Sequence, residues 1–223
     1  MRPALVIFDC DGVLVDTEAI YFEMNRRFVL SHKTSGPADF DLSYYERFIG
    51  LAADLMWGEL KETFALRESV AELIATEKDL KAKALGAAPL VPLAGVSEFM
   101  ADLAAAEIPM SVASSGRRDN VQLILKKLGF ADKFKAVVTG EDITRGKPAP
   151  DIFLKAAELC GVDAAAAVVI EDSKNGTLGA KAAGMRCVGY INPHSGNQDL
   201  SQADIRISSF LSPELRAFCG VKR

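Results

Sequence analysis

The fold is decided by residues 5–12, which read Leu5-Val6-Ile7-Phe8-Asp9-Cys10-Asp11-Gly12. Apolar residues followed by two acids and a glycine predict a buried strand over residues 4–8 that ends in a sharp turn. In an open α/β sheet, ligands collect beyond the carboxyl ends of the strands. Asp9 and Asp11 are therefore candidate site residues, and their partners should follow other strands.

From about residue 87 onward, strand-like and helix-like segments alternate. The predicted strands are 110–113, 136–138, 167–170, 187–190 and 203–207, and the predicted helices are 96–106, 119–128, 151–160, 175–183 and 213–218. Strands separated by helices of this length are typical of βαβ units, which form a parallel sheet covered on both faces. The predicted fold class is therefore α/β, with a Rossmann-like, doubly wound parallel sheet.

Residues 17–86 have a different character, because helical patterns dominate there and strand-like alternation nearly vanishes. Ser43 and Glu46 have capping-box spacing and predict a helix start. The breakers from Gly86 to Pro92 are typical of a return linker. We therefore expect a discontinuous core domain, residues 1–16 and 87–223, that carries a helical insert, residues 17–86.

Composition excludes several classes of protein. The chain has 223 residues, 26 basic and 30 acidic, with a net charge of −4, so charge indicates neither a nucleic-acid nor a membrane partner. No apolar run approaches the ~18 residues of a membrane span. The four cysteines are widely spaced, which favours a cytoplasmic protein with reduced thiols. We expect a monomer or a small homo-oligomer whose partner is a small molecule.

Polar residues also follow or precede other elements of the expected sheet. They are Ser114-Ser115-Gly116 after one strand, Lys147 ahead of a helix, and Glu171-Asp172 after another strand. Because the carboxyl ends of parallel strands share one edge of the sheet, we expect these residues to converge on Asp9 and Asp11.

The converging residues predict a phosphate site with a metal ion. Several carboxylates in one pocket repel each other unless a cation is present, and Mg²⁺ suits oxygen ligands without histidine or cysteine. Ser114 and the backbone N–H groups of Ser115 and Gly116, at a helix entry, can bind a phosphoryl group, and Lys147 adds a positive charge. Two aspartates can then divide the work of nucleophile and general acid/base.

Taken in order, these motifs resemble the four motifs of the haloacid dehalogenase superfamily, and the helical insert resembles its C1 cap domain. The sequence around Asp9, Lys147 and Glu171-Asp172 is similar to that of the branch of this superfamily that includes phosphosugar phosphatases and β-phosphoglucomutase. The resemblance implies that Asp9 is the nucleophile and Asp11 the general acid/base. It implies that Ser114 and Lys147 bind phosphate.

The same resemblance implies a Mg²⁺ site and a cap contact. Asp9, the Asp11 carbonyl and Asp172 would hold the ion, with Glu171 as a direct or water-mediated helper. In related caps a glycine-containing segment faces the phosphate, which makes Gly50 and Leu51 candidate substrate contacts. Trp57 and Phe48, by contrast, have the helical spacing of packing residues.

The expected activity is Mg²⁺-dependent hydrolysis of a small phosphorylated metabolite, a sugar phosphate or sugar-acid phosphate, through an aspartyl phosphate. A phosphosugar mutase is the alternative, although its cap carries a basic residue shortly after the glycine that matches Gly50, where this chain has Leu51-Ala52-Ala53. A dehalogenase is disfavoured because that chemistry needs neither Asp11 nor Asp172. A non-catalytic phosphate-binding module is the alternative from another class.

Overall fold

The computed structural model describes residues 2–49 and 53–221. The chain forms two compact units: Met1–Asp16 with Leu90–Arg223 make an α/β unit, and Thr17–Pro89 make a helical unit. The chain thus leaves the α/β unit after Asp16 and returns to it at Leu90. Each unit has its own hydrophobic core.

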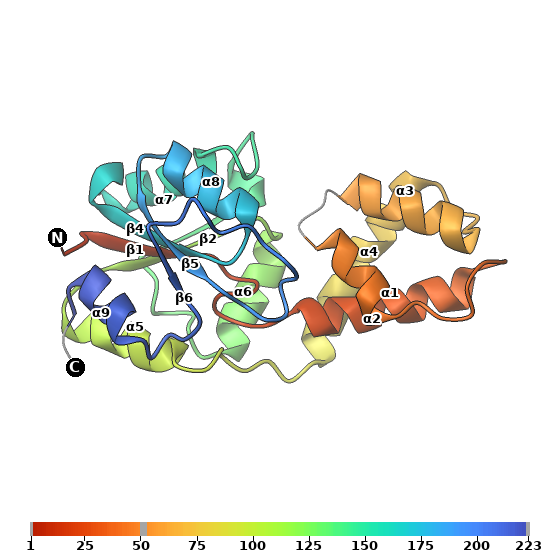
Figure 1. The fold of residues 1–223 in the computed structure, drawn as a ribbon, viewed down its shortest axis with the longest axis horizontal. Coiled ribbons are helices and arrows are strands. Elements are labelled where there is room, and N and C mark those ends of the chain that lie inside the picture. The colour runs from red at the N-terminus through yellow and green to blue at the C-terminus, as the bar shows by residue number, and fades with distance from the viewer. Residues whose placement is uncertain (1, 50–52, 222–223) are drawn as a thin grey trace. The chain divides into compact units, whose positions relative to one another are not determined.

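The α/β unit is built on a parallel sheet, which confirms the predicted fold class (Figure 1). Its strands are β1 (Leu5–Phe8), β2 (Met110–Ser114), β3 (Ala136–Thr139), β4 (Ala167–Glu171), β5 (Arg186–Tyr190) and β6 (Ile205–Ile207), in the order β3-β2-β1-β4-β5-β6. β1 pairs with β2 on one side and with β4 on the other. The strand order reverses between β1 and β4, which is the place where such sheets bind ligands.

Helices cover both faces of this sheet. They are α5 (Val96–Ala105), α6 (Arg118–Lys127), α7 (Asp151–Cys160), α8 (Lys174–Ala182) and α9 (Pro213–Cys219), with short 3₁₀ turns at Gly140–Asp142 and Ala164–Ala166. Figure 1 shows α7 and α8 on one face and α5, α6 and α9 on the other. Because both faces are covered, β1 is buried at every position, as its unbroken apolar run predicts.

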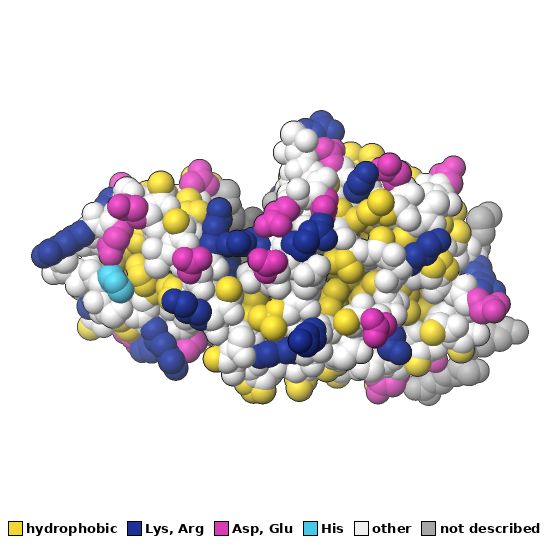
Figure 2. Space-filling view, turned by 180° about the vertical axis from the view of Figure 1, so that it is seen from behind, with side chains coloured by type: hydrophobic (Ala, Val, Ile, Leu, Met, Phe, Trp, Pro, Cys, Tyr) yellow, Lys and Arg dark blue, Asp and Glu magenta, His cyan; other side chains and the backbone are white. Residues whose placement is uncertain are grey.

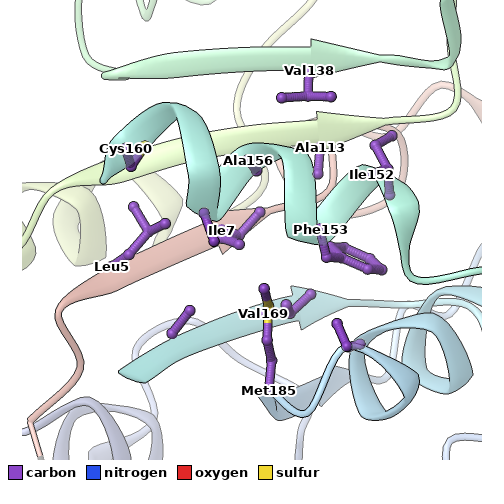
Figure 3. Close-up of a cluster of buried hydrophobic side chains, with 14 of the residues drawn as sticks. Leu5, Ile7, Ala113, Val138, Ile152, Phe153, Ala156, Cys160, Val169 and Met185 are labelled. Atoms are coloured by element: carbon purple, nitrogen blue, oxygen red, sulfur yellow. The ribbon is translucent and has the colours of Figure 1, made fainter. Parts of the chain in front are cut away.

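A hydrophobic core between α7 and the sheet holds β1 and its neighbouring strands in place (Figure 3). Ile152, Phe153 and Ala156 project from one face of α7 onto the strands, and all three are fully buried. Facing them are Leu5, Ile7, Ala113, Val138 and Val169 from four neighbouring strands. Each large apolar side chain buried here contributes roughly 1.5–3 kcal/mol. On the opposite face, Phe8 packs edge-on against Phe99 of α5, with ring centroids 6.2 Å apart.

The helical unit contains α1 (Glu18–His32), α2 (Leu42–Tyr45), a 3₁₀ turn at Glu46–Phe48, α3 (Ala53–Phe64) and α4 (Val70–Ala87). Its aromatic core includes Phe48 and the fully buried Trp57, so both are packing residues, as their spacing predicts. The indole Nε1 of Trp57 donates to Glu77 Oε2 at 2.9 Å, which satisfies a polar group that burial would otherwise leave unpaired.

Two expectations for the helical unit are wrong in detail. Asp41, not Ser43, caps α2, because the Asp41 Oδ1 atom lies 2.9 Å from the Tyr44 N–H that donates to it. The capping box stands instead at Ser69 and Glu72, at the start of α4. α4 also runs through Gly86 to Ala87, so that glycine lies inside a helix and not in the linker.

The helices, the surface and the cysteines bear on the expectations drawn from composition. None of the helices in residues 2–49 and 53–221 has the length and apolar character needed to cross a membrane. On the face drawn in Figure 2, acidic and basic side chains are interspersed over both units. The four cysteines are free and buried. The cytoplasmic location inferred from them stays a prediction.

Candidate active site

The end of β1 places the two acids differently. Asp9 is buried, and its backbone N–H donates to the Ile170 carbonyl of β4 at 3.0 Å. Asp11 lies two residues beyond Asp9 and is partly exposed. Asp9 is therefore fixed in the interior, whereas Asp11 is reachable from solvent.

Gly12 allows the chain to turn directly over the second acidic motif. Its φ of +83° is in the left-handed region that glycine tolerates best, and its N–H donates to the Val15 carbonyl at 2.7 Å. A Cβ atom at this position would lie only 2.0 Å from Asp172 Oδ2. The turn after β1 and the carboxylate after β4 are thus in contact, across the point where the strand order reverses.

Lys147 joins the motifs. Its Nζ atom donates to Asp9 Oδ1 at 2.5 Å, to Glu171 Oε1 at 2.6 Å and to the Ala113 carbonyl at 3.0 Å. The side chain is almost fully buried, so all three ammonium hydrogens find acceptors within the protein. Burial alone would lower the pKa of Lys147, but the charges of Asp9 and Glu171 raise it above the usual lysine value. Lys147 is therefore a permanent cation.

Glu171 supports this lysine. Its side chain is 1% exposed, Oε1 accepts from Lys147, and Oε2 accepts from the N–H and hydroxyl of Ser173 at 3.0 and 2.8 Å. The Ser173 hydroxyl also accepts from the Gly176 N–H at 3.0 Å and caps α8. Both oxygens of Glu171 are thus engaged by the protein.

Asp172 is hydrogen bonded to Ser195, whereas the neighbouring Glu171 is bonded to Lys147. Asp172 is buried, and its Oδ2 accepts a hydrogen bond from the Ser195 hydroxyl. Burial raises the pKa of Asp172 well above its usual value, and the negative charges of Glu171 and Asp9 raise it further. Burial likewise raises the pKa of Asp9 to about 7, although Lys147 opposes this shift. One lysine does not neutralise this group of acids, which therefore favours a further cation.

The loop after β2 forms the third side of the site. Ser114 ends β2, is buried, and accepts the Gly116 N–H at its Oγ at 3.0 Å. Ser115 is exposed at the tip. A Cβ at Gly116 would lie 3.8 Å from Asp11 Oδ2, so this loop lies beside the turn after β1. The ten-residue helix α6 starts just beyond, at Arg118, and helix N-termini favour anions.

The donor set fits Mg²⁺. Over the described part of the chain, no three His, Cys, Asp or Glu side chains form a ready-made metal cluster. Mg²⁺ does not need one, since it usually takes one or two carboxylates and completes its shell with waters and substrate phosphate. Asp9 and Asp172 supply two buried carboxylates that interact electrostatically. The Asp11 carbonyl lies in the turn after β1, next to Gly12. These residues are suitable ligands.

The structure thus brings Asp9, Lys147, Glu171 and Asp172 together, with the loop of Ser114, Ser115 and Gly116 beside Asp11. Gly50 and Leu51 lie outside the described residues. Sequence reasoning missed three residues: Gly176, Asn192 and Ser195. A glycine within a helix costs stability and signals close approach, as Gly176 does here. The rule applied to the other strand ends also applies to β5, which is followed by Asn192 and Ser195.

Comparison with known proteins identifies relatives. The model of the family described as Haloacid dehalogenase-like hydrolase matches residues 6–190. The chain is 31% identical over 209 residues to a phosphorylated carbohydrates phosphatase of Thermotoga maritima, with 94% of each chain covered. It is also 31% identical over 190 residues to a beta-phosphoglucomutase of Bacillus subtilis, with 82% of this chain and 81% of the relative covered.

Among solved structures, the chain is similar to CbbY from Rhodobacter sphaeroides in complex with xylulose-(1,5)bisphosphate. The TM-score is 0.80 at 20% sequence identity, covering 94% of this chain and 95% of the other. At that level of identity the similarity supports the shared fold.

Proposed function

Because the chain belongs to the family of haloacid dehalogenase-like hydrolases, we propose that it is a Mg²⁺-dependent phosphatase of small phosphorylated carbohydrates. The chain is a phosphoric monoester hydrolase, as are those of its relatives that are named phosphatases. The substrate class, the metal and the course of the reaction are our proposal. The name of the Thermotoga maritima relative supports a phosphorylated carbohydrate as substrate, and we include a sugar-acid phosphate in the proposal.

Asp9 is the nucleophile and Asp11 the acid and base. An oxygen of Asp9 forms a bond to phosphorus while the bond between phosphorus and the sugar oxygen breaks, and Asp11 gives its proton to that oxygen. Asp11 then takes a proton from water, and the water oxygen attacks phosphorus and releases phosphate from Asp9. The burial of Asp9 and the partial exposure of Asp11 support this division of roles.

The remaining residues bind charge. Ser114, the Ser115 N–H and Lys147, through its positive charge, attract the phosphoryl oxygens. The Gly116 N–H joins them when it exchanges its bond to Ser114 Oγ for one to phosphate. Lys147 also opposes the rise in the pKa of Asp9 that burial causes, and it fixes the position of Asp9, while Glu171 keeps Lys147 in place.

Asp9, the Asp11 carbonyl and Asp172 hold Mg²⁺. When bound, the ion neutralises charge on the phosphoryl group and on the carboxylates. Gly50 and Leu51 remain candidate substrate contacts of the helical unit.

The observation that carries the proposal is the ammonium group of Lys147, shared between Asp9 and Glu171 at the strand switch point. The test is phosphate release from a panel of phosphorylated carbohydrates with Mg²⁺. We expect Asp9→Asn to lose roughly 10³-fold or more in turnover, with an unchanged circular dichroism spectrum. Asp132→Asn, an exposed site on the same unit, is the matched control. Undiminished Mg²⁺-dependent turnover by Asp9→Asn would refute the role of Asp9 as nucleophile. Absence of turnover in the unmutated chain would leave a phosphate-binding module.

The mutase remains a second candidate because one relative carries that name. The same residues would then return the phosphoryl group to the sugar. Leu51-Ala52-Ala53 supplies no basic residue for a second phosphate, which favours hydrolysis. Isomer conversion primed by a sugar bisphosphate, measured beside phosphate release, distinguishes the two. Conversion without release would establish the mutase.

A further inference from the structure

The loop after β5, residues 191–198, carries polar side chains that the reaction as derived above does not use. Asn192 and Ser195 are buried, at 5% and 4% exposure. Burial of an amide and a hydroxyl is costly unless they are hydrogen bonded, so their partners show what the loop stabilises.

These partners belong to the proposed metal site. The Ser195 hydroxyl donates to Asp172 Oδ2, and the Asn192 side-chain amide donates to the Gly12 carbonyl at 3.0 Å. The loop therefore contacts both the turn after β1 and the carboxylate after β4.

The loop is itself held in shape. The Asn192 Oδ1 atom accepts from the His194 N–H at 2.9 Å, and the Gln198 side chain donates to the Ser195 carbonyl at 3.0 Å. The Gln198 Oε1 atom accepts from the Lys174 N–H at the start of α8, at 3.1 Å. The His194 ring also contacts Asp16, at the far end of the turn. Ser195 and Asn192 are thus fixed donors rather than freely rotating ones.

A purely structural explanation would be that the loop only fills space. An apolar loop would do that at lower cost, because buried polar groups contribute little net stability. Here both buried donors are directed at the two segments that must stay in register for a metal ion to bind: the Gly12 turn, which carries the Asp11 carbonyl, and Asp172. The contact of Gly12 with Asp172 leaves little room for either to move independently.

We propose that Ser195 and Asn192 are positioning residues, which hold the Asp172 carboxylate and the Gly12 turn in the arrangement that binds Mg²⁺. The inference rests on the proposed metal ligands and extends them to a loop that no motif marks. Ser195 fixes the rotation of the carboxylate through one oxygen. Asn192 fixes the turn through its backbone carbonyl. Partners of this kind typically contribute 10–100-fold to metal affinity or activity.

The test is the dissociation constant of Mg²⁺, measured by titration calorimetry on the full chain. We expect Ser195→Ala to weaken Mg²⁺ binding roughly 10-fold. The Mg²⁺ concentration at half-maximal phosphate release should shift equally, and turnover should largely recover at saturating Mg²⁺. Asn197→Ala, an exposed position on the same loop, is the matched control and should bind Mg²⁺ within about twofold of the unchanged protein.

Asn192→Ala provides a second measurement if Ser195→Ala does not fold, and the same loss of affinity is expected. Unchanged Mg²⁺ affinity in the folded variants would overturn the inference and leave the phosphatase standing. A loss of turnover that saturating Mg²⁺ does not restore, with affinity unchanged, would overturn it as well. By contrast, the proposed function itself would be refuted if the protein without substitutions released no phosphate from any substrate.

Discussion

Replacing Gly176 with alanine tests how tightly the acidic motif is packed. A Cβ at this position in α8 would lie 1.9 Å from the Glu171 carboxyl carbon and Oε1, and 2.2 Å from Oε2. Ordinary contact begins near 3.4 Å, so the carboxylate must move by about 1.5 Å, the difference between 3.4 and 1.9 Å. The 2.6 Å bond from Lys147 to Glu171 cannot survive such a shift.

The magnitude follows from two opposing effects. Alanine gains up to ~1 kcal/mol over glycine in a helix, whereas overpacking costs ~1–3 kcal/mol. Gly176→Ala should therefore lower the free energy of unfolding by up to about 2 kcal/mol. Activity should fall much further, by roughly 10²-fold, because Lys147 loses one of the groups that position it against Asp9.

Gly58→Ala is the matched control. Gly58 also lies inside a helix, α3, but a Cβ there would meet nothing within 4 Å. It should gain about 0.5–1 kcal/mol of stability and keep its activity. Urea unfolding and phosphate release measure both variants. If Gly176→Ala behaves like Gly58→Ala in both assays, the packing argument is wrong.

Two further predictions concern pH and helix capping. Burial raises the pKa of Asp9 from 3.8 to about 7, so between those pH values the folded chain binds more protons than the unfolded chain, and the stability of the metal-free protein should fall as pH rises through that interval. Thermal unfolding in EDTA should show a shallower fall in Asp9→Asn, and an equal slope would contradict the assignment. Separately, Ser69→Ala should cost about 1 kcal/mol, because Ser69 and Glu72 form the capping box of α4. An unchanged urea midpoint would show that this cap does not contribute.

Much of the fold was predictable because its signals are local. The apolar run before Asp9 predicts a buried strand wherever it occurs, and the breakers between segments mark where elements end. Errors arose where neighbours compete for the same role. Asp41 and Ser43 both suit a helix cap, and only the backbone of the folded chain shows that Asp41 takes it.

The sequence by itself determined the order of strands and helices, the acids at the end of β1 and the polar residues that follow β2 and β4. These features depend only on residue type and on spacing within short segments of the sequence. Only the tertiary structure decided which groups meet. Lys147 lies 138 residues from Asp9, and Asn192 lies 180 residues from Gly12. No local pattern specifies such pairings, because they arise from the packing of α7, which follows Lys147, on β1 and its neighbours, and from the order of β1, β4 and β5 in the sheet.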